Sequence, residues 1–402
     1  MPADPSTLVS TSTTSKLVAG AVAGETTDTH SERVLALDGL RGIAASMVII
    51  AHAISALAKP ISAVLALHES PVSLLSNGGG GVHIFFVLSG YCLSRPASRI
   101  RSLVTLVQFY LRRIMRIHPP YVAGLMISWI LSGWLYDRSA PTDALSQSWI
   151  DLRRIHISPR VLQQSLLFPG EAFVQLPVGW TLKVEALFSI FLPFLMLVAV
   201  RAHWLLLIAL SIPVLAIEAS TTYDFLRFTL DFSFGIAIYC ERDRLAVLFE
   251  QMPAWLRGVM LATGIALLTS PPYFMLDAAL PIRTLVLYCG GAALIVMCAV
   301  HMPSVRQLLS RGPVSYLGRI SYSVYLIHVP VIILLTPYVD HQLNFFEGTL
   351  FVFVSLLATY SIAPVVYTVI EEPAMHAGYW LSGKLDRFVQ PAPQASAEGN
   401  EK

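Results

Sequence analysis

The stretch LDGLRGIAASMVIIAH, residues 37–52, lies in the first long apolar run of the chain and carries an arginine and a histidine within it. In a helix, the step from Arg41 to His52 makes about three turns and ~20°, so both side chains share one face, about 16 Å apart along the axis. An ionisable residue inside a bilayer costs about 2.5–3.5 kcal/mol and usually faces a bundle interior. Pairing of Arg41 with Asp38, and simple packing of His52, are the plainer interpretations. Together the two residues favour a polar cavity.

The rest of the chain repeats this apolar character. Of 402 residues, 55% are hydrophobic and only 13% are charged, about half of the roughly 25% charged residues in soluble domains. Ten apolar runs approach the ~20 residues that span a bilayer; they cover residues 36–58, 80–94, 117–135, 180–200, 203–219, 226–240, 254–270, 283–300, 319–337 and 347–370. We therefore expect an all-α, polytopic membrane protein with about ten transmembrane helices.

The distribution of basic residues predicts the orientation. The densest basic segment lies between the second and third runs and holds Arg95, Arg99, Arg101, Arg112, Arg113 and Arg116. Lys and Arg are enriched in short cytoplasmic loops, so both termini are expected in the cytoplasm, an N-in/C-in arrangement. We expect a flexible N-terminal tail over 1–33, a membrane domain over 34–375, and a cytoplasmic C-terminal segment over 376–402 that is disordered toward its end.

The net charge and the cysteine positions limit which partners and cofactors the sequence predicts. The net charge of +2 gives no evidence of nucleic-acid binding, and the partner that composition predicts is the lipid bilayer. Four cysteines lie in or at the ends of apolar runs, and their spacing matches no metal motif; they are Cys92, Cys240, Cys289 and Cys298. We expect free thiols and no metal.

Two later helices bring polar groups to the same depth. WTLKVE, residues 180–185, places Trp180 at the outer interface and Glu185 about one and a half turns deeper. In ISYSVYLIH, residues 320–328, Ser321, Tyr325 and His328 follow helical spacing and share a stripe, whereas Tyr322 and Ser323 point elsewhere. A histidine and a glutamate in a membrane cavity suit general-base catalysis, but they equally suit a proton-coupled transporter.

Six segments of the chain, taken together, resemble the acyltransferase-3 family of integral membrane O-acyltransferases. They fall in the order of the family and extend over nearly the whole chain apart from its tails: LDGLRGIAASMVIIAH (37–52), GGVHIFFVLSGY (80–91), RRIMRIHPPY (112–121), WTLKVE (180–185), ISYSVYLIHVPV (320–331) and IEEP (370–373). Three positions depart from the usual pattern, with His83 in place of Asp, His118 in place of an aromatic residue, and Ser189 in place of Tyr.

The resemblance implies an enzyme of the bacterial inner membrane. Such an enzyme takes an acyl group, usually acetyl, from cytoplasmic acyl-CoA and delivers it to a hydroxyl of a carbohydrate or glycoconjugate, which is O-acetylation of a polysaccharide or a similar acceptor. Arg41 and His52 match the family's essential pair, Arg113 and Arg116 match its R-x-x-R element beside the donor site, and Glu185 matches its Trp–Glu motif. The remaining candidates lie on the matched segments; they are Asp38, Tyr121, Trp180, Ser321, Tyr325 and His328.

These assignments lead to a mechanistic hypothesis. Arg112, Arg113 and Arg116 would bind the phosphates of coenzyme A. His52 would take the proton from the acceptor hydroxyl or briefly carry the acyl group. Glu185 would orient His52, and Arg41 would grip the donor or stabilise an oxyanion. The alternatives are a proton-coupled transporter or flippase of a sugar-linked substrate and, behind it, a membrane scaffold.

Overall fold

A computed structural model describes residues 10–57, 71–134, 143–154, 159–167, 178–218, 226–273, 281–339 and 341–389. Within these ranges the regular structure is helical, and one isolated antiparallel bridge joins Leu57 to Leu145. This confirms the prediction of an all-α fold.

Every predicted apolar run falls on a helix of the structure. The first half of the described chain forms α1 (Ser10–Ser55), η2 (Pro71–Ser76), α3 (Gly78–Ala97), α4 (Leu103–Trp134), α5 (Gln147–Arg154), α6 (Pro159–Leu167), α7 (Gly179–Ala202) and α8 (Trp204–Glu218). The second half forms η4 (Leu226–Phe228), α9 (Thr229–Cys240), α10 (Arg242–Gln251), α11 (Ala254–Tyr273), α12 (Pro281–His301), α13 (Pro303–Leu309), α14 (Gly312–Arg319), α15 (Ser321–Leu335), η5 (Thr336–Tyr338), α16 (Phe345–Val366), η6 (Tyr367–Glu371) and α17 (Glu372–Val389).

Five helical segments of the described chain are long and apolar enough to cross a membrane; they are Arg33–Ser55, Gly179–Ala202, Thr284–His301, Ser321–Tyr338 and Phe345–Leu385. They support a multi-pass membrane protein. The other runs form helices that are short or carry charges. For example, α9 has 12 residues and a length of about 18 Å, against a hydrocarbon core of about 30 Å. Ten crossings and the N-in/C-in orientation therefore remain predictions.

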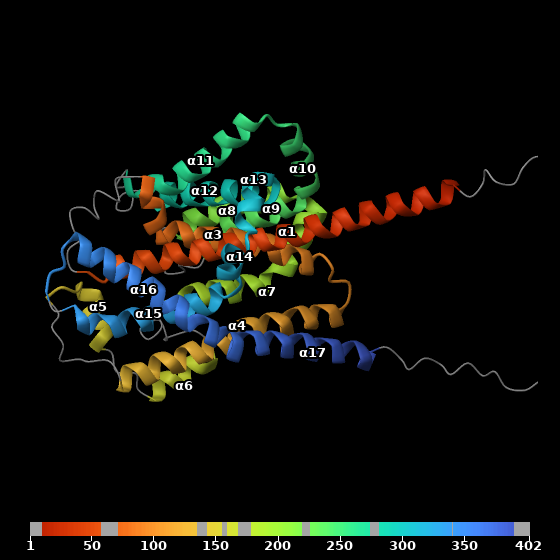
Figure 1. The fold of residues 1–402 in the computed structure, drawn as a ribbon. Coiled ribbons are helices and arrows are strands. Elements are labelled where there is room, and N and C mark those ends of the chain that lie inside the picture. Colours follow the sequence, from red (N-terminus) through yellow and green to blue (C-terminus); the bar gives the residue numbers. More distant parts are fainter. Residues whose placement is uncertain are drawn as a thin grey trace, which may run out of the picture.

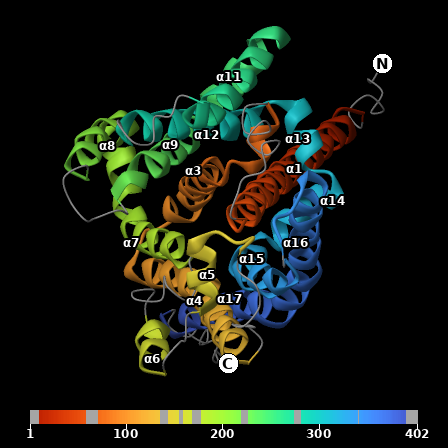
Figure 2. The same ribbon diagram turned by 90° about the vertical axis from the view of Figure 1, so that its left-hand side faces the viewer.

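Helix α1 runs through the middle of the bundle and separates two groups of helices (Figures 1 and 2). It packs on α3, α12 and α13 on one side and on α14, α15 and α16 on the other. Val48 and Ile49 belong to one hydrophobic cluster, and Ala44 and Met47 belong to the other. A helix that is apolar around most of its circumference is a buried helix, so α1 can present Arg41 and His52 to the interior.

Glycines allow the closest helix contacts in the bundle. A Cβ atom at Gly90 of α3 would meet the backbone of Phe232, and one at Gly235 of α9 would meet the backbone of Val87 and Tyr91. Small residues at such crossings let membrane helices approach backbone to backbone. The α3–α9 pair therefore packs closely, and α3 forms one wall of the cavities described below.

The structure describes helix toward both ends of the chain, and the domain boundaries and tails remain predictions. Helix α1 begins at Ser10. Adding residues to an existing helix costs far less free energy than starting a new one, and no proline interrupts residues 10–33. The predicted C-terminal segment is likewise helical through Val389, where α17 packs on α4; residues 390–402 lie outside the described ranges.

Candidate active site

An arginine-rich cavity, here called the vestibule, lies between the middle of α1, the first half of α4, the start of α17 and the C-terminal ends of α3 and α14. It has a volume of about 600 Å³. Six arginines line it; they are Arg41, Arg99, Arg112, Arg113, Arg116 and Arg319. Arginine binds phosphate through two parallel charge-assisted hydrogen bonds, so the vestibule has the chemistry of a site for a phosphorylated ligand.

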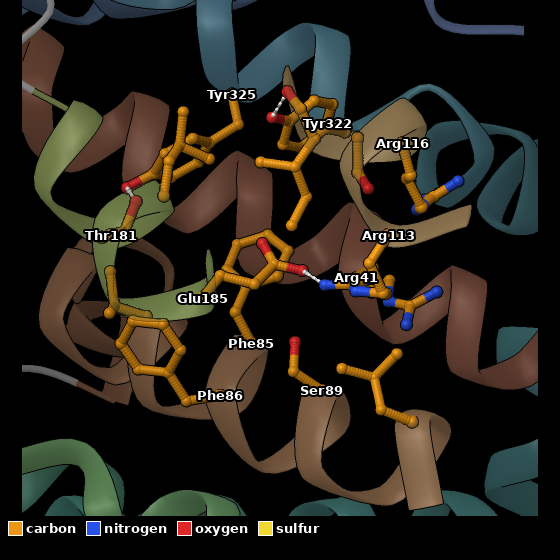
Figure 3. A pocket seen from close by; sticks show the side chains of 15 residues that line it. Arg41, Phe85, Phe86, Ser89, Arg113, Arg116, Thr181, Glu185, Tyr322 and Tyr325 are labelled. Atoms are coloured by element: carbon orange, nitrogen blue, oxygen red, sulfur yellow. Dashed lines mark hydrogen bonds and ion pairs between the residues drawn. The ribbon is translucent and has the colours of Figure 1, made fainter. Parts of the chain in front are cut away.

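A smaller cavity, here called the chamber, continues inward from the vestibule. Its volume is about 80 Å³, and it shares Arg41, Arg113 and Arg116 with the vestibule. Figure 3 shows these three arginines together on one side, Phe86 on the other side, and Phe85 and Glu185 in the centre. The two cavities therefore form one route, here called the donor route, which begins at the vestibule arginines and ends at the aromatic side chains of the chamber.

Arg113 forms the tightest ion pair of this route. Its Nη2 donates to Glu185 Oε1 at 2.7 Å, and its Nε donates to Ser189 Oγ at 3.1 Å. The Arg113 side chain is only 11% exposed. Glu185 thus finds its partner in an arginine of α4, whereas we had expected it to orient His52. A single sequence shows no signal that would choose between these two partners.

The other two arginines of the chamber also have acidic neighbours. Arg41 Nη1 lies 3.2 Å from Asp38 Oδ1, as the spacing predicts. Arg116 Nη2 lies 3.8 Å from Oε1 of the fully buried Glu371. Ser323 Oγ donates to the other oxygen of Glu371 at 2.6 Å. Each chamber arginine therefore has its own carboxylate.

His52 meets a second histidine three helical turns beyond Arg41. His52 Nδ1 and His328 Nε2 lie 2.8 Å apart, and the two rings are nearly parallel, with centroids 5.0 Å apart. His328 is fully buried on α15, whereas His52 is partly exposed. His328, the last residue of the stripe predicted on α15, therefore contacts His52, the histidine predicted on α1.

The hydrogen bonds of this pair determine which nitrogen of His52 is free. His328 Nδ1 lies 2.8 Å from the carbonyl oxygen of Tyr325. A carbonyl only accepts, so Nδ1 of His328 carries the proton, and in the neutral ring Nε2 must accept. His52 Nδ1–H is then the donor to His328. This leaves Nε2 of a neutral His52 with its lone pair available, which is the requirement for a general base.

A short helix outside the predicted spans covers His52. Trp149 of α5 contacts the His52 ring edge-on, with centroids 6.4 Å apart. Its indole nitrogen donates to Ser55 Oγ at 3.1 Å, and Ser146 Oγ donates to the Ser55 carbonyl at 2.7 Å. Ser146 and Trp149 lie outside the ten predicted apolar runs, and no pattern in the sequence predicts this cover.

Tyr325 stands between the chamber and the histidine pair. Its ring lines the chamber, and its centroid lies 5.6 Å from that of His328. Its hydroxyl forms a hydrogen bond of 2.9 Å with Thr181. His52 is not among the described residues that line the chamber, so Tyr325 connects the two parts of the site.

The remaining predicted residues divide between the cavities and the packing. Ser321 lines the chamber, and Arg112 lines the vestibule, where it donates to Ser382 Oγ at 2.9 Å. Tyr121 is buried, and its hydroxyl donates to the Ser165 carbonyl at 2.9 Å, so it ties α4 to α6. Trp180 stacks on a phenylalanine outside both cavities.

Two residues outside the predicted set of site residues also belong to the site. Tyr322 lines the chamber, although the stripe on α15 excluded it. Glu371 comes from η6, a single turn of π-helix between α16 and α17. π-Turns often occur at functional sites. The IEEP segment was the signal in the sequence, but only the fold brings it to Arg116.

Comparison with known families identifies the domain. The family model described as "Acyltransferase domain" (Acyl_transf_3) matches residues 34–368. The chain belongs to the acyltransferase-3 family. The match confirms the resemblance found in the motifs. No solved structure gives a significant match.

Three curated proteins illustrate the range of this acyltransferase-3 domain. The chain is 28% identical over 388 residues to "Putative peptidoglycan O-acetyltransferase YrhL" of Bacillus subtilis, covering 87% of this chain and 56% of YrhL. It is 28% identical over 333 residues to "Putative membrane-bound transacylase BcsY" of Komagataeibacter xylinus, covering 77% and 75%. It is 24% identical over 393 residues to "Peptidoglycan O-acetyltransferase OatA" of Listeria monocytogenes, covering 88% and 58%. The chain thus spans little more than half of YrhL and OatA.

Proposed function

We propose that the chain is a membrane O-acyltransferase that moves an acyl group, acetyl first of all, from acyl-CoA to a hydroxyl of a carbohydrate or glycoconjugate. The observation that carries the proposal is the route from the vestibule, through the chamber, to Tyr325 and the histidine pair. The bacterial inner membrane, with the donor arriving from the cytoplasm, is part of the same proposal.

The charges of the vestibule favour a phosphorylated donor such as coenzyme A. The three chamber arginines are matched by three carboxylates. Arg99, Arg112 and Arg319 are exposed, and within the described part of the chain none of them has a carboxylate at ion-pair distance. Positive charge is therefore uncompensated at the vestibule end of the route. We assign the nucleotide phosphates to Arg99, Arg112 and Arg319, so that the arm bearing the thioester points toward the chamber.

The histidine pair supplies the base for the transfer step. Nε2 of His52 removes the proton from the acceptor hydroxyl, and the oxygen attacks the thioester carbonyl. A C–O bond forms, the C–S bond breaks, and the departing thiolate takes the proton from His52. His328 holds His52 in the productive tautomer through the 2.8 Å hydrogen bond and acts as a positioning residue. The alternative is a covalent acyl-His52 intermediate, and label on the protein after brief exposure to donor alone would reveal it.

Arg41 and Glu185 act around this base. Arg41 lines both cavities, so we assign it to gripping the donor as it enters the chamber. Glu185 holds Arg113 in place rather than touching His52. Because Arg113 also reaches Ser189, the glutamate and the serine together fix the fork of one guanidinium.

The acceptor class comes from the relatives. YrhL and OatA carry names that specify peptidoglycan, a glycan with free hydroxyls, and BcsY is named only as a transacylase. We therefore propose a carbohydrate acceptor and leave the individual glycan to experiment.

The proposal is tested with purified full-length protein in liposomes, radiolabelled acetyl-CoA and a crude glycan extract. We expect thioester consumption and label on the glycan with the wild type, and neither with His52→Gln. A transporter would move a sugar-linked substrate across the liposome without consuming acetyl-CoA. Correctly folded wild type that neither binds nor consumes any acyl-CoA would contradict the proposed activity.

A further inference from the structure

A second polar cluster lies in the bundle away from the arginines. It consists of His83 on α3, Asp231 on α9 and Cys289 on α12, which are buried to 4%, 0% and 0% exposure. We infer that these three side chains form a divalent metal site with the ligand chemistry of zinc. The cysteine spacing in the sequence predicted no metal, because the three ligands come from three separate helices.

The donor atoms of the cluster converge on one point. His83 Nδ1 lies 2.9 and 3.0 Å from the two oxygens of Asp231, and 3.7 Å from Cys289 Sγ. One nitrogen, one sulfur and the carboxylate oxygen all lie within 4.8 Å of one another. Zinc binds Cys, His and Asp at about 2.0–2.3 Å, so ligand atoms of one tetrahedral site lie about 3–4 Å apart.

The same geometry argues against a catalytic relay of cysteine, histidine and aspartate. In such a relay, the acid and the nucleophile use opposite nitrogens of the imidazole. Here, Asp231 and Cys289 both face Nδ1 of His83. The three groups therefore gather on one side of the imidazole, where a cation can bind all of them.

Charge balance suits a divalent ion in this low-dielectric place. With a neutral histidine, one thiolate and one carboxylate together balance the two positive charges of the ion. Binding releases the thiol proton to solvent. Three protein ligands leave a fourth position for water, as in open zinc sites. The rings of Phe228 and Tyr288 pack on His83, with centroids 5.4 and 5.1 Å away, and shield the cluster.

The cluster lies beside the chamber but outside the lining of both cavities. Val82, Phe85 and Phe86 of α3 line the chamber, whereas His83, in the same turns of α3, lines neither the chamber nor the vestibule. Within α3, His83 lies ten residues, or about 15 Å of helix, from Leu93, which lines the vestibule. The metal would join α3, α9 and α12 and thus stabilise the bundle without entering the transfer step.

Metal content and cobalt absorption test this site in the intact, detergent-purified protein. After expression with zinc, we expect about one zinc per chain in the wild type and loss of that zinc in Cys289→Ser and Asp231→Asn. Cys298→Ser is the matched control, because Cys298 is also fully buried on α12 but lies outside the cluster. With Co²⁺ in place of zinc, a variant keeping Cys289 as its sole cysteine should show thiolate-to-cobalt absorption.

Three results would overturn the inference. The first is wild type that retains no zinc and develops no cobalt–thiolate absorption, which would make the cluster a hydrogen-bonded ion pair. The second is equal zinc in Cys289→Ser and Cys298→Ser. The third is a melting temperature of the wild type that a zinc chelator leaves unchanged. The sole-cysteine variant keeps the question open to test even where Cys289→Ser fails to fold.

Discussion

His52 and His328 lie 276 positions apart in the chain, yet Nδ1 of one is 2.8 Å from Nε2 of the other. The bond from His328 to the Tyr325 carbonyl makes His328 the acceptor of this pair, and it makes His52 the donor. The free Nε2 of His52 is therefore a consequence of a backbone carbonyl on α15. The helix that carries His52, α1, also carries Arg41, and the helix that carries His328, α15, also carries Tyr325; both Arg41 and Tyr325 line the chamber.

Replacement of His328 tests this positioning role. Leucine cannot accept the hydrogen bond of His52, so His328→Leu should lower kcat by about 10²-fold with little change in the KM for acyl-CoA. Glutamine offers a carbonyl oxygen as acceptor, and His328→Gln should retain clearly more activity than His328→Leu. Steady-state kinetics in liposomes measures both constants.

His301→Gln is the control for this series, since His301 is a buried histidine on α12 outside the site. Its kcat should stay near that of the wild type. Equal loss in His328→Gln and His328→Leu, with both proteins monodisperse, would show that the hydrogen bond is not what matters.

The Arg113–Glu185 pair should behave as a coupled unit. Glu185→Gln leaves a mostly buried guanidinium without its counter-charge, and Arg113→Gln leaves the carboxylate alone, so each single change should destabilise the protein by about 1–3 kcal/mol. The double variant should lose less than the sum of the two. Thermal unfolding in detergent measures the coupling, and strict additivity would mean that the 2.7 Å contact contributes nothing.

The three vestibule arginines without a carboxylate at ion-pair distance, Arg99, Arg112 and Arg319, should determine the affinity for the acyl donor. Arg112→Gln removes a guanidinium from the vestibule and should raise the KM for acyl-CoA about 10-fold, with kcat little changed. Because the attraction is between charges, added salt should weaken donor binding more in the wild type than in this variant. Arg311→Gln changes an exposed arginine outside the vestibule and serves as the control. Identical KM values for the two variants would contradict the assignment of the phosphates.

The buried carboxylate of Glu371 should contribute to stability through two contacts. Glu371→Ala leaves Ser323 without its acceptor and Arg116 without its neighbour. We expect destabilisation of about 1–3 kcal/mol, and less in Glu371→Gln, which keeps an acceptor for the serine. Melting temperatures of both variants check this order. The reverse order would show that the hydrogen bond from Ser323 is not what Glu371 contributes to stability.

Local patterns predicted the helices and several site residues. The apolar runs located α1, α3, α4, α7 and α15, and the helical period placed Arg41 and His52 on one face and led from Ser321 to His328. Patterns within one segment cannot choose partners on another. Glu185 was therefore assigned to His52, although Arg113 holds it, and Glu371 and Trp149 reach the site only because α16, α17 and α5 fold back onto α1 and α4.

We propose that the donor binds at the arginines and reacts at His52, so that donor binding and acyl transfer depend on different residues. A comparison of wild type with His52→Gln separates the two, with the Kd for acetyl-CoA recorded by calorimetry and the single-turnover rate of acetyl transfer recorded on the same preparations. We predict the same Kd within about twofold and a transfer rate lower by at least about 10²-fold. A transfer rate close to that of the wild type, with acetyl-CoA still bound, would contradict the claim.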